Sequence, residues 1–197
     1  MSIFFHATDG IDMPAKAQHA IIVAEGEKYT DLPKDPGGPT KYGWTLRSYR
    51  NVANRHATKY DIMNLSKYEA LKLYEIHFWK KNNDDKIKNK KLAATLFLAQ
   101  VNLGPSRPNK LLQNMVNDYC PRNIKFHSKT INYNLKVDGI IGSKTIEAVN
   151  NCKYVWPGYP YVLYYLYHSS PSIAPVWKWA RRGLTNRIFY ILHMGDN

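Results

Sequence analysis

The chain has 197 residues, a formal net charge of +13 at pH 7 and an apolar fraction of 44%. This length suits one domain or two closely packed lobes. Aromatic residues make up 13% of the chain and need burial or stacking partners, which excludes an intrinsically disordered protein. The positive charge favours a polyanionic partner such as nucleic acid, an anionic membrane or an anionic cell wall, or serves solubility alone.

Two features bear on where the protein is made. Residues 1–10 lack the basic region and long apolar run of a signal peptide, and no run reaches the roughly 20 apolar residues of a membrane span. The only cysteines are Cys120 and Cys152, too few for a disulfide framework or a zinc site, so we expect both to be free and buried. The sequence therefore predicts synthesis in the cytoplasm without stable membrane insertion.

The first predicted helix covers residues 12–25, with Asp12 as its cap and Pro14 in its first turn. Its apolar stripe recurs at helical spacing: Ala17, Ala20, Ile21 and Ala24. Gly26 ends the helix, so Glu25 is its last residue and faces the following segment. Residues 26–45 are predicted to form a loop or short hairpin, because Pro36-Gly37-Gly38-Pro39 forces turns.

Further helices follow. Residues 46–60 are predicted to be helical, and Ser66 with Glu69 forms a capping box for the next helix. The predicted buried stripe of that helix is Ala70, Leu73, Tyr74, His77 and Phe78, closed by Trp79. Residues 80–91 are polar and rich in Lys and Asn; they mark the best internal boundary, and we expect a solvated surface segment there.

The C-terminal half is also predicted to be helical. Two apolar stripes stand on either side of Gly104-Pro105: Leu92, Leu96, Ala99 and Leu103, then Leu112, Met115, Val116 and Tyr119. Asp138-Gly139 signals a turn, Ser143 caps a short helix, and a last helix covers roughly residues 175–192. The predicted fold class is mainly α, with one region over residues 12–85 and a second over 91–192, packed as one compact unit.

Two carboxylates and a hydroxyl gather around the Gly-Gly turn: Glu25, Asp35 and Thr40. Cleavage of a glycosidic bond needs one acid to protonate the leaving oxygen and a second carboxylate to activate water or stabilise positive charge on the sugar. A hydroxyl beside the second acid can hold the water. Any chain contains many Glu/Asp pairs, so the pair by itself is a weak signal.

A longer motif surrounds these residues. Glu25-Gly26, Tyr29 and the run Asp35-Pro36-Gly37-Gly38-Pro39-Thr40-Lys41-Tyr42-Gly43-Trp44-Thr45 resemble the glycoside hydrolase family 108 motif, Glu-Gly-Gly-Tyr followed by Asp-x-Gly-Gly-x-Thr-x-x-Gly-(Ile/Val)-Thr. Later segments resemble the family in the same order: Phe78-Trp79, Phe97 to Gly104, Val137 to Thr145, and Trp179 to Arg187. The segment from Val137 resembles a C-terminal region often labelled peptidoglycan-binding.

The resemblance implies a lysozyme-like helical fold whose short loop or hairpin carries the active site. It implies a peptidoglycan hydrolase of the phage endolysin type, an N-acetylmuramidase that needs no cofactor. It would be bacteriolytic, reaching the cell wall or periplasm after release. By the same resemblance Glu25 is the general acid, while Asp35 and Thr40 position the water.

The sequence departs from the family motif at one point. Glu25-Gly26-Glu27-Lys28-Tyr29 is one residue longer than Glu-Gly-Gly-Tyr, so the family's acid, measured back from Asp35, falls on Gly26. Glu27 is therefore a rival for the general acid. We prefer Glu25 because it keeps the Glu-Gly junction and the apolar helix that leads into it.

Four further residues are candidates for substrate binding. Tyr29, Tyr42 and Trp44 can stack on sugar faces, or they pack the loop. Asn102 can hydrogen-bond to the substrate, or it is a polar group near a helix end. The histidines form no His-x-x-x-His pair, so no metal is expected.

The expected partner is peptidoglycan, and the expected state is a monomer. The alternative function is a cell-wall-binding protein with a lysozyme-like fold and no catalysis. No helix-turn-helix, zinc-finger or RNA-binding signature supports a nucleic-acid partner.

Overall fold

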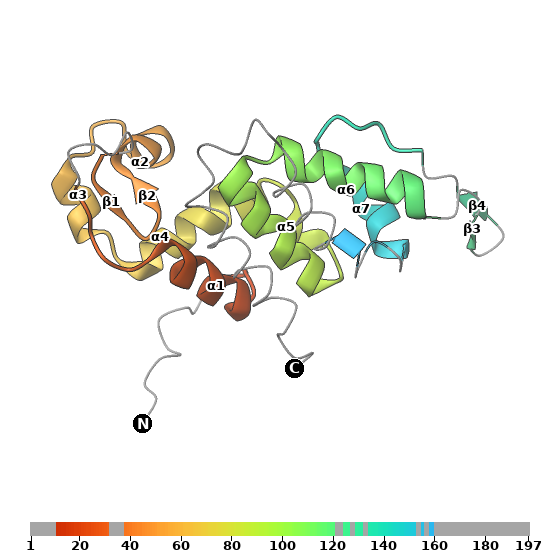
Figure 1. Ribbon diagram of the computed structural model, residues 1–197, viewed down its shortest axis with the longest axis horizontal. Coiled ribbons are helices and arrows are strands. Elements are labelled where there is room, and N and C mark those ends of the chain that lie inside the picture. Colours follow the sequence, from red (N-terminus) through yellow and green to blue (C-terminus); the bar gives the residue numbers. More distant parts are fainter. Residues whose placement is uncertain are drawn as a thin grey trace, which may run out of the picture. The chain divides into compact units, whose positions relative to one another are not determined.

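The computed structural model describes residues 11–31, 38–120, 124–126, 129–131, 134–152, 155 and 158–159. This part of the chain is mainly helical, as the sequence predicts (Figure 1). It divides into two compact units, Met1–Lys81 and Asn82–Asn197. None of the described helices has the length and apolar character to span a membrane. The helix predicted over residues 175–192 lies outside the described residues.

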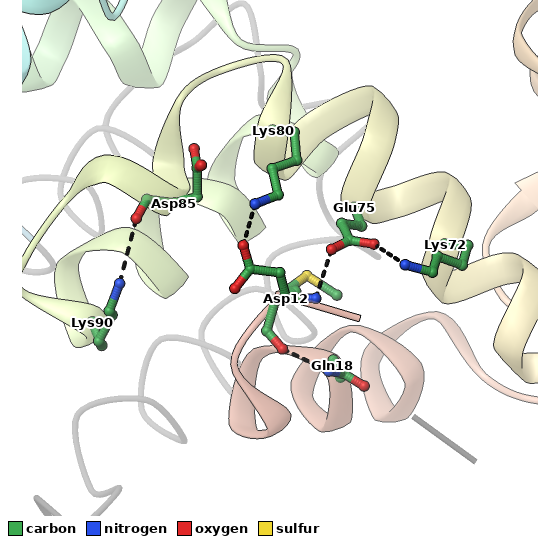
Figure 2. A network of polar contacts seen from close by, with 8 residues as sticks. Asp12, Gln18, Lys72, Glu75, Lys80, Asp85 and Lys90 are labelled. Carbon is green, nitrogen blue, oxygen red and sulfur yellow. Dashed lines mark hydrogen bonds and ion pairs between the residues drawn. The ribbon is translucent and has the colours of Figure 1, made fainter. Parts of the chain in front are cut away.

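The first unit begins with helix α1 (Ala15–Glu25), which ends at Glu25 as predicted. Asp12 does not cap it; Pro14 holds the cap position without a side-chain hydrogen bond. The backbone N–H of Asp12 instead donates to Glu75 Oε1 at 2.6 Å, and its carboxylate pairs with Lys80 (Figure 2). The Asp12 carboxylate therefore does not cap α1. It forms an ion pair with the Lys80 ammonium group and so joins the start of α1 to a later helix.

A two-stranded hairpin follows α1 in the same unit. Strand β1 (Thr40–Lys41) pairs with β2 (Trp44–Thr45), with Lys41 opposite Trp44. The two turn residues, Tyr42 and Gly43, have φ angles of 52° and 78°, the left-handed pair that a type I′ hairpin turn requires. Thr30 adds a third backbone to the other edge of β1, since its N–H and carbonyl both bond to Thr40 at 2.8 Å.

The predicted helix over residues 46–60 is wrong, because one helix ends at Val52 and another begins only at Lys59. Helix α2 (Leu46–Val52) starts at a Thr45–Ser48 capping box, and helix α3 (Lys59–Asn64) starts at a Thr58–Asp61 capping box. The backbone N–H groups of Ala53 and Asn54 both donate to Tyr49 O, at 2.8 and 3.4 Å, which closes α2. The second capping box, at Thr58, starts a new helix, so α2 does not continue through this stretch.

Helix α4 (Lys67–Tyr74) begins at the predicted capping box, since Ser66 Oγ accepts from Glu69 N–H at 3.1 Å and Glu69 Oε2 accepts from Ser66 N–H at 2.9 Å. It continues into a π-helical segment, η1 (Glu75–Lys80). The predicted buried stripe is wrong in part: Leu73, His77 and Phe78 are only half-buried. The face that is buried consists of Ala70, Leu71, Tyr74, Glu75 and Trp79. The wider π-helical turn shifts that face away from a regular 3.6-residue period.

The second unit is built around helix α5 (Lys90–Leu103), which contacts helix α6 (Ser106–Tyr119) and the short 3₁₀ helix η2 (Asp84–Lys86). Every residue from Leu92 to Gln100 is buried, as expected of a helix at the centre of a core. Gly104, with φ 73°, ends α5 at the predicted place. Strands β3 (Ile124–Phe126) and β4 (Lys129–Ile131) form a hairpin, and helix α7 (Ser143–Asn151) contacts α6.

The polar segment over residues 80–91 is not simply a solvated surface, because Asp84 and Ile87 are fully buried. Asp84 Oδ1 accepts a hydrogen bond from Gln100 Nε2, and Gln100 Nε2 also donates to Asn109 Oδ1, both at 3.0 Å. Asn109 Nδ2 in turn donates to Gly139 O at 2.9 Å. A buried polar side chain is tolerated where such partners replace water, so this chain of amides joins η2, α5 and α6 to the Asp138-Gly139 turn.

The prediction that both cysteines are free is wrong. Cys120 and Cys152 form a disulfide that joins the end of α6 to the end of α7, with their Cα atoms 5.7 Å apart. Both residues are buried in the second unit. The two cysteines are 32 residues apart in the sequence. Their pairing could not be predicted, because only the packing of α7 on α6 brings the two thiols together.

Candidate active site

Glu25 occupies the last position of α1. Gly26 follows with φ 82°, and its N–H closes the helix by donating to Ile22 O at 2.9 Å. A positive φ favours glycine, and at Gly26 it turns the chain away from the helix axis. The half-buried Glu25 side chain is therefore left at the helix end. A carboxylate in this position is fixed by a packed helix and is partly withdrawn from water.

The hairpin turn lies directly against Glu25. A methyl group added to Gly43 would come within 2.7 Å of Glu25 Cγ and 2.4 Å of Tyr74 Oη, both closer than carbon atoms and hydroxyls pack. Only a residue without a side chain allows this approach. Gly43 is therefore needed both for the turn and for the contact with the carboxylate side chain.

Tyr74 holds the other side of this contact. It is 3% exposed in helix α4 and donates its hydroxyl proton to Tyr42 O in the hairpin turn at 3.0 Å. This hydrogen bond ties α4 to the same turn that touches Glu25. The end of α1, the tip of the hairpin and the end of α4 thus meet at one point of the first unit.

Glu27, the rival acid, has a different environment. Its side chain is 59% exposed, and its carboxylate forms an ion pair with Lys67 at 3.1 Å. Solvent screens such a pair strongly. Glu25 contacts the packed hairpin and Glu27 contacts a surface lysine, so the two candidates have different surroundings.

Thr40 lies at the start of the hairpin. Its backbone pairs with Thr30 on one side and Thr45 on the other, and its hydroxyl donates to Gly38 O at 2.8 Å. The hydroxyl oxygen retains lone pairs that can accept a further hydrogen bond. The predicted second carboxylate, Asp35, falls within residues 32–37 and lies outside the described residues.

The predicted sugar-stacking role does not fit Trp44. Its side chain is 3% exposed, and its indole N–H donates to Ala70 O at 3.2 Å. Its ring packs on Tyr74 and Phe78, with centroids 4.9 and 6.3 Å away. The ring therefore belongs to the core beneath the hairpin, because the inward face of β2 points toward α4.

Tyr29 and Tyr42 are half-buried, so part of each ring faces solvent. Tyr29 donates its hydroxyl proton to Asp31 Oδ2 at 3.3 Å. Desolvation, followed by the charge and hydrogen bond of Asp31, raises the pKa of Tyr29. Lys41 Nζ lies 5.4 Å from the centroid of the Tyr42 ring, a distance at which a cation is attracted to the ring face.

Asn102 lies in the second unit, one residue before the end of α5. Its Nδ2 donates to Leu98 O of the same helix at 2.7 Å. This bond is the one expected of a polar group near a helix end. Among the described residues, no group of three His, Cys, Asp or Glu side chains could hold a metal ion.

Tyr74 was not predicted as a partner of the site. The apolar spacing places Tyr74 on a buried stripe but gives no sign that its hydroxyl reaches the hairpin. The available signal was the Tyr itself, because a buried tyrosine needs a hydrogen-bond acceptor for its hydroxyl. The identity of that acceptor, Tyr42 O, depends on the tertiary fold.

Comparison with known proteins agrees with the resemblance seen in the sequence. Among curated protein sequences, none matches this chain. A solved structure described as that of Brucella abortus SagA is similar in fold, with a TM-score of 0.69 and 23% sequence identity over 93% of this chain and 95% of that one. Residues 18–104, which include Glu25, Thr40 and the whole hairpin, match the family model described as Glycosyl hydrolase 108. This part of the chain is a glycosyl hydrolase family 108 domain.

Proposed function

We propose that the chain is an N-acetylmuramidase. It hydrolyses the β-1,4 bond between N-acetylmuramic acid and N-acetylglucosamine in peptidoglycan, with Glu25 as the general acid. Membership of a glycosyl hydrolase family implies a polysaccharide substrate. The narrower assignment to peptidoglycan rests on the resemblance of residues 25–45 to the family's muramidase motif.

The single observation that carries the proposal is the position of Glu25. A general acid works best when packed elements hold it rigidly at the site, because proton transfer depends on its position. Glu25 ends a packed helix and lies against the Gly43 turn. Glu27 is exposed and paired with Lys67, so it neither packs against the hairpin nor is withdrawn from water.

The remaining roles follow the chemistry of inverting and retaining glycosidases. The second carboxylate would be Asp35, which activates water or stabilises the positive charge on the sugar. Thr40, at the start of the hairpin, would hold the water through its hydroxyl oxygen. Tyr29 and Tyr42 offer partly exposed rings to the sugars.

The disulfide supports a site of action outside the cytoplasm. Cys120 and Cys152 are joined, and disulfides persist mainly in oxidising compartments such as the periplasm. The protein would be made in the cytoplasm, as a phage endolysin is, and would act as a monomer on the cell wall after release. The net charge of +13 would draw it to the anionic envelope.

The test compares two substitutions of equal chemistry, Glu25→Gln and Glu27→Gln. Each variant is incubated with purified peptidoglycan, and new reducing ends are measured over time. Circular dichroism and thermal unfolding check that both variants fold. We expect Glu25→Gln to lose turnover by roughly a hundredfold or more, as loss of a general acid does, while Glu27→Gln retains the wild-type rate.

Two results would contradict the proposal. Loss of turnover in Glu27→Gln alone would move the acid to Glu27. If the wild-type protein sediments with peptidoglycan and produces no reducing ends, it is a cell-wall-binding protein without catalysis.

A further inference from the structure

A pocket lies in the first unit, and the residues proposed for catalysis do not line it. It has a volume of about 250 Å³ and is lined by Tyr49, Tyr60, Asp61, Asn64, Leu65 and Glu69. These residues come from α2, from α3 and the residue after it, and from the first turn of α4. We name it the capping-box pocket, because its two acids are the carboxylates of the α3 and α4 capping boxes.

Each of these carboxylates uses one oxygen for its helix. Asp61 Oδ2 accepts from the backbone N–H and the hydroxyl of Thr58, both at 2.7 Å. Glu69 Oε2 accepts from the backbone N–H and the hydroxyl of Ser66, at 2.9 and 2.6 Å. Among the described residues, the structure gives Asp61 Oδ1 and Glu69 Oε1 no hydrogen bond or ion pair. A carboxylate can accept about four hydrogen bonds, so both side chains have acceptor capacity left.

The pocket is acidic in a basic protein. Its lining contains two carboxylates and neither Lys nor Arg, whereas the chain as a whole carries +13. The capping hydrogen bonds from Thr58 and Ser66 lower the pKa values of Asp61 and Glu69. Both carboxylates are therefore ionised at neutral pH, and together they attract a cation.

Two tyrosines complete the lining. Burial, followed by the nearby charges of Glu69 and Asp61, raises the pKa of Tyr49. Its hydroxyl therefore remains neutral. Tyr60 is 62% exposed, and Lys59 Nζ already lies 5.7 Å from the centroid of its ring. Aromatic rings attract cations and also cover the apolar chain to which a cation is attached.

We propose that the capping-box pocket binds a primary ammonium group carried on an uncharged chain. The free oxygens of Asp61 and Glu69 would accept its N–H bonds, the hydroxyl of Tyr49 would accept another, and the ring of Tyr60 would cover the adjoining carbons. The volume of about 250 Å³ accommodates an aminoalkyl chain or one sugar ring. Two sources present this chemistry: a lysine-type side chain of a wall peptide, and an amino sugar that lacks its acetyl group.

The inference goes beyond the proposed function, because it concerns recognition and needs no bond cleavage. Its connection with the cell wall rests on that function, whereas the ammonium chemistry rests on the pocket alone. Probes without a cleavable bond therefore test the pocket independently of Glu25.

The experiment is a nuclear magnetic resonance titration of the full chain with Nα-acetyl-L-lysine methylamide. The matched probe is the same molecule with its side-chain amine acetylated, which removes the charge and two N–H bonds and adds an acetyl group. A second pair of probes, the monosaccharides glucosamine and N-acetylglucosamine, distinguishes a sugar source from a peptide source. We expect the free amine of at least one pair to bind roughly tenfold more tightly than its acetylated form, as charged hydrogen bonds would produce.

Variants locate the binding. Asp61→Asn and Glu69→Gln each remove one charge but keep an oxygen for the capping bonds, so α3 and α4 remain intact. Glu147→Gln is the control, because it removes one exposed negative charge from α7. The two pocket variants should each lose roughly tenfold in affinity for the free amine, while the control keeps the wild-type affinity.

Three results would overturn the proposal. The first is binding of the acetylated and free forms with equal affinity, which would mean recognition without the charge. The second is an absence of binding by every probe. The third is a loss of affinity in Glu147→Gln as large as in the pocket variants, which would indicate a long-range effect of net charge.

Discussion

The side chain of Glu25 lies against the α-carbon of Gly43, so closely that a methyl group on Gly43 would be 2.7 Å from Glu25 Cγ and 2.8 Å from Glu25 Cβ. This contact connects the beginning and the end of the family 108 motif. The glycine of the hairpin turn does more than shape the turn. It sets how near the hairpin can come to the proposed general acid.

Substituting Gly43 by Ala should therefore impair both stability and turnover. The new methyl group would meet Tyr74 Oη at 2.4 Å and Glu25 Cγ at 2.7 Å, and residue 43 has φ 78°. The left-handed backbone alone costs about 1–2 kcal/mol, and displacing the hairpin adds to this. We expect turnover on peptidoglycan to fall by at least roughly tenfold, since a misplacement near 1 Å is enough.

The control for this prediction is Gly104→Ala. Gly104 has a similar φ of 73°, but a methyl group there would meet nothing within 4 Å. Chemical denaturation should show a loss from backbone strain in both variants, because Gly104, with ψ 154°, also has a conformation that favours glycine, whereas only Gly43→Ala should lose turnover. If Gly104→Ala and Gly43→Ala have equal turnover, the contact with Glu25 does not matter for the reaction.

Trp44→Phe distinguishes a packing residue from a substrate-binding residue. The indole N–H bond to Ala70 O and part of the buried ring are lost, which should lower the free energy of unfolding by about 1–3 kcal/mol. Because the ring is 3% exposed, KM for peptidoglycan fragments should stay at the wild-type value. Tyr42→Asn is the contrasting variant, because it removes a half-exposed ring and asparagine tolerates a positive φ. In this variant KM should rise. A raised KM in Trp44→Phe with unchanged stability would restore the stacking role.

Reducing the Cys120–Cys152 disulfide should lower the free energy of unfolding. A cross-link between residues 32 apart restricts the unfolded chain and contributes roughly 3–4 kcal/mol on chain-entropy grounds. Guanidinium titrations with and without dithiothreitol measure this directly. The double variant Cys120→Ser, Cys152→Ser should unfold at the same denaturant concentration in both conditions. If dithiothreitol shifts the unfolding midpoint of the wild type no more than that of the variant, the disulfide is not formed.

Asp84 should make the stability depend on pH. Burial raises its pKa well above 3.8, and the neighbouring Asp85 adds to the shift, while the Gln100 hydrogen bond opposes it. Folding therefore favours the protonated carboxyl group, so its contribution is complete below the unfolded pKa and is lost as the pH rises toward the folded one. In Asp84→Asn the amide oxygen can still accept from Gln100 and cannot ionise. We expect the stability of this variant, relative to wild type, to increase from pH 4 to pH 7 in urea titrations. A constant difference between these pH values would contradict the burial of an ionisable acid.

Features that depend on neighbouring residues could be predicted from the sequence. The end of α1 at Glu25, the Ser66–Glu69 capping box and the end of α5 at Gly104 each follow from a local pattern of apolar spacing, caps and glycine. These interactions span a few residues, so the chain around them does not alter them. The family resemblance likewise follows from a contiguous motif.

Features that depend on distant residues were decided only by the tertiary structure. Trp44 is buried because α4 covers the inward face of the hairpin, and Asp84 is buried because Gln100 provides a partner within the core. The disulfide needs α7 to pack on α6. The surroundings of Glu25 and Glu27 are of the same kind. The two acids, two positions apart, look alike in the sequence, whereas in the structure Gly43 approaches Glu25 and Lys67 pairs with Glu27.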